Sequence, residues 1–277
     1  MKLDTGQRAT LTRAERFALD VGAAMNERPA LKAAGMWFNK AVASRWMTLV
    51  SEPRIRLVDL EKVKALRPDR GVLLAANHRS FFDMFMVATY LNHHTDLCRR
   101  IYFPVRSGFF YDRPLGVALN GAMSAMAMYP PVFREGEKRD VTRAGLDFLA
   151  AELARPGTLV GIHPEGTRGK GDDPYELLPP EQGFGRVALL AKPIIIPVFI
   201  NGMTNDLGRE CLSTFRGTGA PIIIVFGDPV DLSDFAGADP TRLRAQIDVG
   251  RRTLDAIARL AAIEREVRAG NEAAVVR

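Results

Sequence analysis

Short strand-like segments, several of them continuously apolar, alternate with helix-like segments from residue 54 onward, and this alternation constrains the fold more than any other feature. Strands without polar side chains are typical of a sheet that is covered by helices on both faces. The predicted strands are Ile55–Val58, Gly71–Ala76, Ile101–Val105, Ser124–Tyr129, Thr158–Ile162, Ile194–Ile200 and Ile222–Phe226. The predicted helices lie near residues 81–92, 112–121, 137–154, 183–191 and 240–268. The pattern predicts an α/β domain over residues 54–268, with a mixed, mostly parallel sheet flanked by helices.

Residues 12–52 are predicted to form a helical pair that precedes this domain. Thr12 and Glu15 have the spacing of a capping box, and Pro29 suits the first turn of a second helix. Six apolar residues recur at helical spacing in that second helix: Leu31, Ala34, Phe38, Val42, Trp46 and Leu49. This stripe suits packing on the sheet or contact with a membrane surface, and the sequence leaves both open.

The charge balance favours an anionic partner. The chain has 38 basic and 32 acidic residues, a formal net charge of +6. Zinc-finger spacing and an aromatic-rich RNA-binding signature are both missing, so nucleic acid is not an expected partner. No apolar run reaches the roughly 18 residues of a spanning helix. Since Lys32, Lys40 and Arg45 lie beside the apolar stripe, with Trp37 and Met47 flanking it, a membrane surface is the expected partner.

One polar segment directly follows the strand Gly71–Ala76, where an α/β sheet commonly carries its site. His78 and Asp83 are five residues apart, so they would not share a face of one straight helix. They can meet if His78 precedes the helix and Asp83 lies in its first turns. Asp83 would then fix the histidine tautomer, and the other ring nitrogen could take a proton from a substrate hydroxyl. A buried structural histidine beside a helix-start aspartate is the alternative.

A second polar loop, residues 163–171, follows the strand Thr158–Ile162. Gly166 permits close backbone approach, and Arg168 offers a charged fork that suits phosphate. A solvated surface loop is the alternative for this segment. His163 is either a further titrating group beside the site or a strand-end histidine that is bonded to backbone.

Four motifs resemble those of the glycerolipid acyltransferase family, which includes the 1-acylglycerol-3-phosphate acyltransferases. In the family's order they are Asn77-His78-x-x-x-x-Asp83, Gly108–Arg113, Pro164-Glu165-Gly166-Thr167-Arg168 and Ile194–Val198. The resemblance implies a glycerol-3-phosphate acyltransferase-like fold. It also implies transfer of a fatty acyl group from acyl-CoA or acyl-carrier protein to a lysophospholipid, above all 1-acylglycerol-3-phosphate. No metal or bound cofactor is implied, and the expected location is cytoplasmic, peripheral on the inner face of the membrane.

Site residues follow from the resemblance position by position. His78 would be the general base, and Asp83 would orient it. Six residues would bind substrate: Arg113, Glu165, Gly166, Thr167, Arg168 and Pro197. Arg168 and Arg113 would contact the acceptor phosphate, and Pro197 would shape a pocket. The chain departs from the family at His163, where an apolar or aromatic residue is common, and after Arg168, so another lipid or glycolipid acceptor stays open.

Two other functions are compatible with the same residues. A metal-dependent hydrolase could use His78, Asp83, His163 and Glu165 as ligands, because these residue types suit zinc or manganese. However, their spacing matches no paired-ligand motif. A non-catalytic lipid-binding protein on the same fold is the other possibility, and the presence of the histidine and both carboxylates weakens it.

Overall fold

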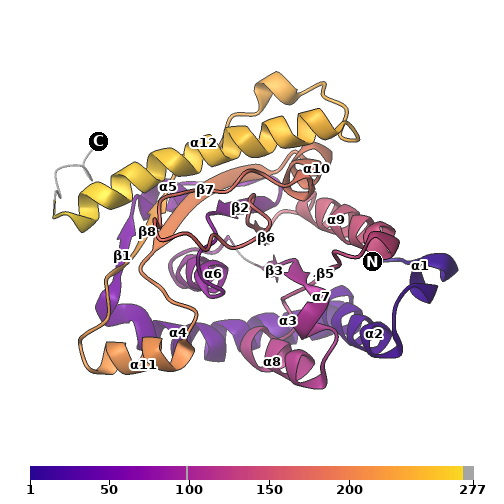
Figure 1. The fold of residues 1–277 in the computed structure, drawn as a ribbon, viewed down its shortest axis with the longest axis horizontal. Coiled ribbons are helices and arrows are strands. Elements are labelled where there is room, and N and C mark those ends of the chain that lie inside the picture. The colour runs from indigo at the N-terminus through magenta and orange to yellow at the C-terminus, as the bar shows by residue number, and fades with distance from the viewer. Residues whose placement is uncertain (98, 271–277) are drawn as a thin grey trace.

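A six-stranded sheet forms the centre of the protein (Figure 1). The computed structural model describes residues 1–97 and 99–270, so Cys98 and residues 271–277 lie outside it. The strands, in spatial order, are β1 (Ile55–Val58), β8 (Ile222–Phe226), β7 (Ile194–Asn201), β2 (Val72–Ala76), β6 (Thr158–Ile162) and β3 (Arg100–Tyr102). All neighbouring pairs are parallel except β7 and β8. The predicted α/β fold with a mixed, mostly parallel sheet is confirmed, and β2, β6 and β7 end at one edge.

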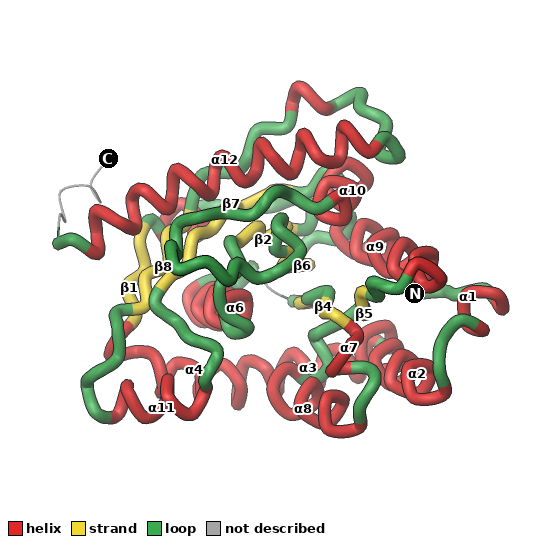
Figure 2. The backbone as a smooth tube through the Cα atoms, viewed as in Figure 1, coloured by secondary structure: helices red, strands yellow, loops and turns green. Residues whose placement is uncertain are grey.

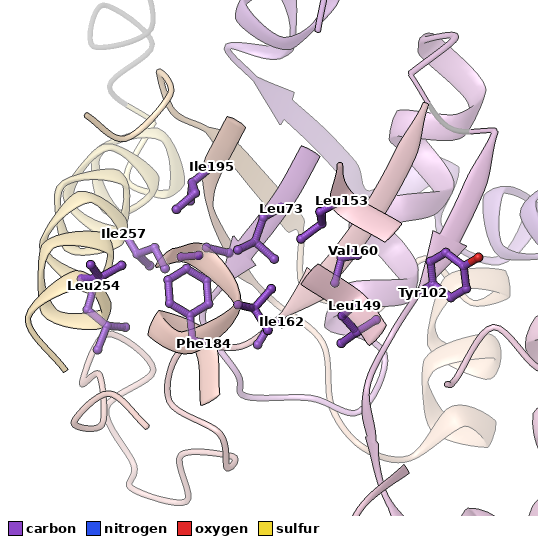
Figure 3. Packing of buried hydrophobic residues seen from close by; sticks show 14 of the residues in the cluster. Leu73, Tyr102, Leu149, Leu153, Val160, Ile162, Phe184, Ile195, Leu254 and Ile257 are labelled. Carbon is purple, nitrogen blue, oxygen red and sulfur yellow. The ribbon is translucent and has the colours of Figure 1, made fainter. Parts of the chain in front are cut away.

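Three helices cover one face of the sheet: α9 (Arg139–Leu153), α10 (Gln182–Ala191) and α12 (Leu243–Arg268). Figure 3 shows how their side chains interdigitate with the strands. Leu73 and Ile195 of the sheet pack in one cluster with Phe184 of α10 and Ile257 of α12. All four side chains are at most 2% exposed. Because alternate strand residues point to this face, the continuous apolar strands bury both their faces.

The other face is covered by α5 (Leu60–Lys64) and α6 (Asp83–His94), with an outer helical layer beyond them. Figure 2 shows this outer layer as a row of helices along one side of the molecule. Its members are α2 (Arg13–Glu27), α3 (Pro29–Phe38), α4 (Ser44–Ser51), α8 (Pro114–Ser124) and α11 (Leu207–Phe215). The smaller elements are α1 (Thr5–Ala9), α7 (Ser107–Phe110), a strand pair β4 (Val105–Arg106) and β5 (Pro131–Val132), a π-helical turn Asn39–Ala43, and 3₁₀ turns Glu52–Arg54, Gly136–Lys138 and Ser233–Phe235.

The N-terminal helices begin where the sequence predicts. Thr12 and Glu15 form the capping box of α2, and Pro29 is the first residue of α3. The predicted helix beyond Pro29 continues through the π-helical turn into α4. The division of the chain into domains at 12–52 and 54–268 stays a prediction.

The alternative in which the apolar stripe packs on the sheet is wrong, because most of the stripe points outward. Val42, Trp46 and Leu49 are 45%, 41% and 63% exposed, and Trp37 beside them is 70% exposed. The inward face instead carries small or unexpected residues: Lys32, Gly35, Ser44, Met47, Val50 and Ser51. Small residues let this helix lie close to its neighbours, and the π-helical turn shifts the phase of the inward face.

The predicted strand Ser124–Tyr129 is also wrong. Ser124 ends α8, and Ala125 and Met126 follow with φ of 47° and 64°. Left-handed backbone of this kind interrupts an extended strand. The segment is apolar because Met126 and Tyr129 are buried, at 3% and 0% exposure.

Candidate active site

The carboxyl end of β2 is fixed to its neighbour by Asn77. Its side-chain amide donates to the carbonyl of Ile200 at 2.9 Å and its amide oxygen accepts from the Ile200 N–H at 2.8 Å. Asn77 is fully buried, so these bonds satisfy a polar group that would otherwise be costly to bury. The next residue, His78, is therefore anchored at the edge where β2, β6 and β7 end.

His78 and Asp83 face each other, as the sequence predicts, because the chain turns before α6 begins at Asp83. One carboxylate oxygen of Asp83 accepts the backbone N–H groups of Arg79 and Ser80, at 2.7 and 2.6 Å. The same oxygen lies 3.6 Å from Nδ1 of His78, which is longer than a hydrogen bond. That nitrogen is buried and has no hydrogen-bond partner among the described residues. A small closure would bring the two groups into contact, as often happens when substrate binds.

The loop after β6 wraps around His78. Glu165 is 2% exposed, and its two oxygens accept the backbone N–H groups of His78 and Leu178, at 2.9 and 2.8 Å. Gly169 donates its N–H to the His78 carbonyl at 2.9 Å. Gly166 has a φ of +62°, and a Cβ there would meet Glu181 at 2.6 Å, so glycine is required. Glu165 thus holds the turn that carries His78, a role that its position in the sequence does not indicate.

His163 stacks directly on His78. The ring centroids are 3.8 Å apart, and the rings are within 6° of parallel. Nδ1 of His163 lies 3.0 Å from the carbonyl oxygens of both Ala76 and Asn77. Since carbonyls only accept, Nδ1 carries the proton in the neutral ring. His163 is therefore the strand-end histidine bonded to backbone, and its ring also lies against the site.

Burial governs the ionisation of this cluster. It lowers the pKa of His78 to about 3, with the positive charge of Arg168 adding to the effect. Burial also lowers the pKa of His163 to about 3, and the neighbouring His78 contributes. Burial raises the pKa of Asp83 to about 6. Near neutral pH both imidazoles are consequently uncharged, which is the form that can accept a proton.

Arg168 is exposed, and its orientation comes from Asn205. The guanidinium donates to the Asn205 side-chain oxygen at 2.7 Å, and this oxygen also accepts the Phe81 N–H at 2.8 Å. Asn205 lies in the loop after β7, at the same sheet edge as the other residues. Polar residues that follow the strands of an α/β sheet are expected at that edge. However, Arg168 and Asn205 are 37 positions apart, and no sequence motif pairs them, so the sequence does not predict this contact.

The remaining predicted residues differ in their contacts with this cluster. The second motif reaches it through Phe110, whose ring stacks on that of Phe81 at 5.4 Å. Arg113 is exposed at the start of α8, and within the described residues it makes no hydrogen bond or ion pair with the other site residues. Pro197 lies inside β7, opposite Ala75 of β2, and its carbonyl accepts the Gly227 N–H. Thr167 is half-buried in the loop between Gly166 and Arg168.

The arrangement can orient a neutral imidazole and present a guanidinium a short way along the same edge. Within residues 1–97 and 99–270, no group of three His, Cys, Asp or Glu side chains converges in a way that could hold a metal ion. In the same part of the chain, no helix is long and apolar enough to cross a membrane.

Comparison with known protein families gives a match. The family model described as Acyltransferase matches residues 54–201, which is more than half of the chain. The matched region contains the turn of His78 and Asp83, the Glu165–Arg168 loop and β7. No curated protein matches the sequence.

Proposed function

Because the chain belongs to the acyltransferase family, the glycerolipid acyltransferases that its motifs resemble, we propose that it acylates the free hydroxyl of a lysophospholipid. The proposed donor is the thioester of acyl-CoA or acyl-carrier protein. The proposed acceptor is 1-acylglycerol-3-phosphate, which would give phosphatidic acid. The observation that carries the proposal is the meeting of the His78–Asp83 turn with the Glu165–Arg168 loop at one sheet edge.

His78 is the general base of the proposed reaction. With Nδ1 turned toward Asp83, Nε2 is the nitrogen that takes the acceptor's hydroxyl proton. The acceptor oxygen then bonds to the thioester carbonyl carbon, and the carbon–sulfur bond breaks. The departing thiolate takes the proton back from His78, so the enzyme is unchanged. The carboxylate of Asp83 stabilises the transient imidazolium, the role that an aspartate has beside a catalytic histidine.

Arg168 binds the acceptor phosphate in this proposal. Its guanidinium is held by a neutral amide rather than by a carboxylate, so its charge is available to a phosphate. Arg113 is a second candidate phosphate contact, and Gly166 and Thr167 shape the loop between base and phosphate. Pro197 acts on the site through the strand β7.

We also propose that the enzyme is peripheral on the inner face of the cytoplasmic membrane. Trp37, Trp46 and Leu49 are exposed on α3 and α4, and tryptophan prefers the membrane interface. No acidic residue occurs between Pro29 and Ser51, and Lys40 and Arg45 are exposed there. Lys32 is not part of this contact, because it is buried with its ammonium bonded to Asn26. The full chain should float with vesicles that contain phosphatidylglycerol, and high salt should weaken this binding.

A panel of acceptors tests the reaction. The purified chain is given one acyl-CoA with lysophosphatidate, lysophosphatidylcholine, monoacylglycerol or a glycolipid, and thiol release and product are measured. Lysophosphatidate should be preferred, and Arg168→Ala should raise its KM about tenfold or more, since a charged hydrogen bond is lost. Lys170→Ala, which removes an exposed charge two residues away, is the control. A preference for glycolipid would support the other acceptor class, and no transfer to any acceptor would contradict the proposal.

The two other functions receive no specific support. Nδ1 of His163, a ligand in the metal-dependent hydrolase, donates its proton to backbone carbonyls. Turnover of a thioester with a lysolipid would separate the enzyme from a lipid-binding protein.

A further inference from the structure

Helix α11 exposes an apolar face that the site does not use. Leu212 is 48% exposed and Phe215 is 70% exposed. They are three residues apart, so they lie on the same side of the helix. Arg209 and Arg216 are exposed on that side as well, at positions three before and four after Leu212. An apolar face flanked by basic residues is typical of a helix that lies in a membrane interface.

The opposite side of α11 is fixed to the protein by a buried polar cluster. Glu210 and Arg54 form an ion pair of 2.8 Å, with side chains that are 8% and 7% exposed. Thr214 donates its hydroxyl to the Val50 carbonyl of α4 at 2.7 Å. Glu210 is the one acidic residue within α11, and it is buried. The exposed charges at the helix are Arg209, the C-cap Arg216 and the N-cap Asp206. The outward orientation of Leu212 and Phe215 is thus set by the fold.

Helix α11 packs against α4, the N-terminal helix that carries the exposed Trp46. Figure 1 shows α11 in the same row as α4, α3 and α8, on the side of the molecule away from α12. Arg45 of α4 and Arg209 of α11 are exposed beside the apolar side chains, and the acidic residues Glu52 and Asp206 are exposed at the ends of the two helices.

The same helix is connected to the site. Glu210 accepts the backbone N–H and the hydroxyl of Thr204, at 2.7 and 2.6 Å. The carbonyl of Thr204 accepts the Ser80 hydroxyl at 2.8 Å, and Asn205 holds Arg168. A short chain of hydrogen bonds thus joins the first turn of α11 to the turn of His78 and to Arg168.

We propose that α11 is a second membrane contact, in which Leu212 and Phe215 enter the interface of an anionic phospholipid bilayer and Arg209 and Arg216 meet its headgroups. The partner is a bilayer because apolar exposure and positive charge occur together on α11 and continue onto α4. The contact holds α11, and with it the hydrogen-bonded segment that positions Arg168, at the surface that contains the lysophospholipid. This inference rests on the proposed acyl transfer and extends its membrane contact beyond residues 12–52.

The test compares two double variants of the full chain. Leu212→Ser with Phe215→Ser removes the proposed contact. Leu190→Ser with Leu243→Ser is the control, because these leucines are 41% and 58% exposed on α10 and α12, on the other side of the sheet. Flotation is measured with phosphatidylcholine vesicles, with and without phosphatidylglycerol. Transfer from acyl-CoA is measured with long-chain lysophosphatidate in the vesicles and with a dissolved short-chain lysophosphatidate.

The α11 variant should bind anionic vesicles about tenfold more weakly than the control, with a similar fall in kcat/KM for the embedded acceptor. Its activity on the dissolved acceptor should equal that of the control. Equal flotation and equal use of the embedded acceptor would overturn the proposal. A parallel loss on the dissolved acceptor would also overturn it, because the residues would then act through the fold. If the wild type acylated neither acceptor, the proposed function would fail, and flotation alone would still decide the α11 contact.

Discussion

Two buried carboxylates of this protein, Glu15 in α2 and Asp83 at the start of α6, have pKa values displaced in opposite directions. Burial alone would raise the pKa of Glu15, but hydrogen bonds from Lys138 and Thr12 hold it below its ordinary value. The Lys138 ammonium lies 2.7 Å away. Asp83 has backbone N–H groups and neutral imidazoles around it, and burial raises its pKa to about 6. A paired buried charge stabilises the fold, whereas an unpaired one at a sheet edge is available for chemistry.

Asp83→Asn should show this difference most strongly. The rate should fall by about 10²–10⁴, because an amide can hold the His78 tautomer that has no free Nε2 lone pair. The folded-state pKa of about 6 lies above the unfolded value of 3.8, so the ionised carboxyl costs stability as pH rises from about 4 to 6. Above pH 6 the variant should therefore be more stable, by at most about 3 kcal/mol. Denaturant unfolding at pH 8 measures the stability, and steady-state kinetics measure the rate. A variant that is active and less stable than the wild type would contradict the comparison.

The pH dependence of kcat/KM of the wild type should also show the raised pKa of Asp83. Asp83 is protonated below its pKa of about 6, and a protonated carboxyl no longer stabilises the imidazolium of His78. The value of kcat/KM should therefore fall as pH drops through about 6, by up to about tenfold per unit. The profile of the residual activity of Asp83→Asn should lack this limb. A wild-type profile that stays flat down to pH 4.5 would show that Asp83 has another role.

Glu15→Gln should affect stability and leave catalysis unchanged. It leaves the Lys138 ammonium without its partner, so the free energy of unfolding at pH 7 should fall by about 1–3 kcal/mol. In the wild type this contribution is present above pH 4.5 and is lost as pH falls through the lowered pKa of Glu15. Glu137→Gln, at an exposed neighbour of Lys138, is the control. Loss of turnover per folded molecule would place Glu15 with the site rather than with the scaffold.

Substitution of His163 should lower the rate far less than substitution of Asp83. Its ring fixes the plane of His78, whose Nδ1 is 3.6 Å from Asp83. His163→Leu removes the stack and should lower kcat by about 2- to 10-fold, the range expected for one aromatic contact. His163→Phe keeps a flat ring and should retain most of the rate, with little change in either KM. If phenylalanine and leucine gave the same loss, the backbone bonds of His163 would matter and the stack would not.

The sequence is most informative where a single force determines the structure. Three strands have the predicted bounds: Ile55–Val58, Thr158–Ile162 and Ile222–Phe226. The last two are apolar almost throughout and fully buried, and a segment of that kind and length has little alternative inside a sheet. The capping box of Thr12 and Glu15 is predictable for the same reason, since it is purely local.

The sequence is less informative where apolar content alone does not determine the backbone conformation or the direction of a helix face. In α3 and α4 the helical spacing of apolar residues leaves open whether the aromatic stripe packs inward or faces a membrane; Gly35 and Ser44 point inward, and Trp37 and Trp46 point out. The apolar content of 124–129 predicts a strand that the left-handed backbone at Ala125 and Met126 rules out. The sequence pattern does not predict helix α11, because its apolar face is short and points outward.

For the site, the strand-end rule is enough to predict that His78, Asp83 and the Glu165–Arg168 loop lie at one sheet edge. It does not predict that Glu165 bonds to the backbone of His78, that His163 stacks on its ring, or that Asn205 holds Arg168. Those contacts join residues that are 37 to 87 positions apart, and their residue types match many partners equally well.

The most direct test of the central claim is the release of free thiol from acyl-CoA, dependent on lysophosphatidate, by the wild type and by His78→Ala. His93→Ala is the control, since His93 is exposed at the far end of α6. If His78 is the general base, its variant should lose about 10²–10⁴ of the rate while unfolding at the wild-type denaturant concentration, and the control should keep full activity. Turnover by a folded His78→Ala variant near that of the wild type would contradict the account.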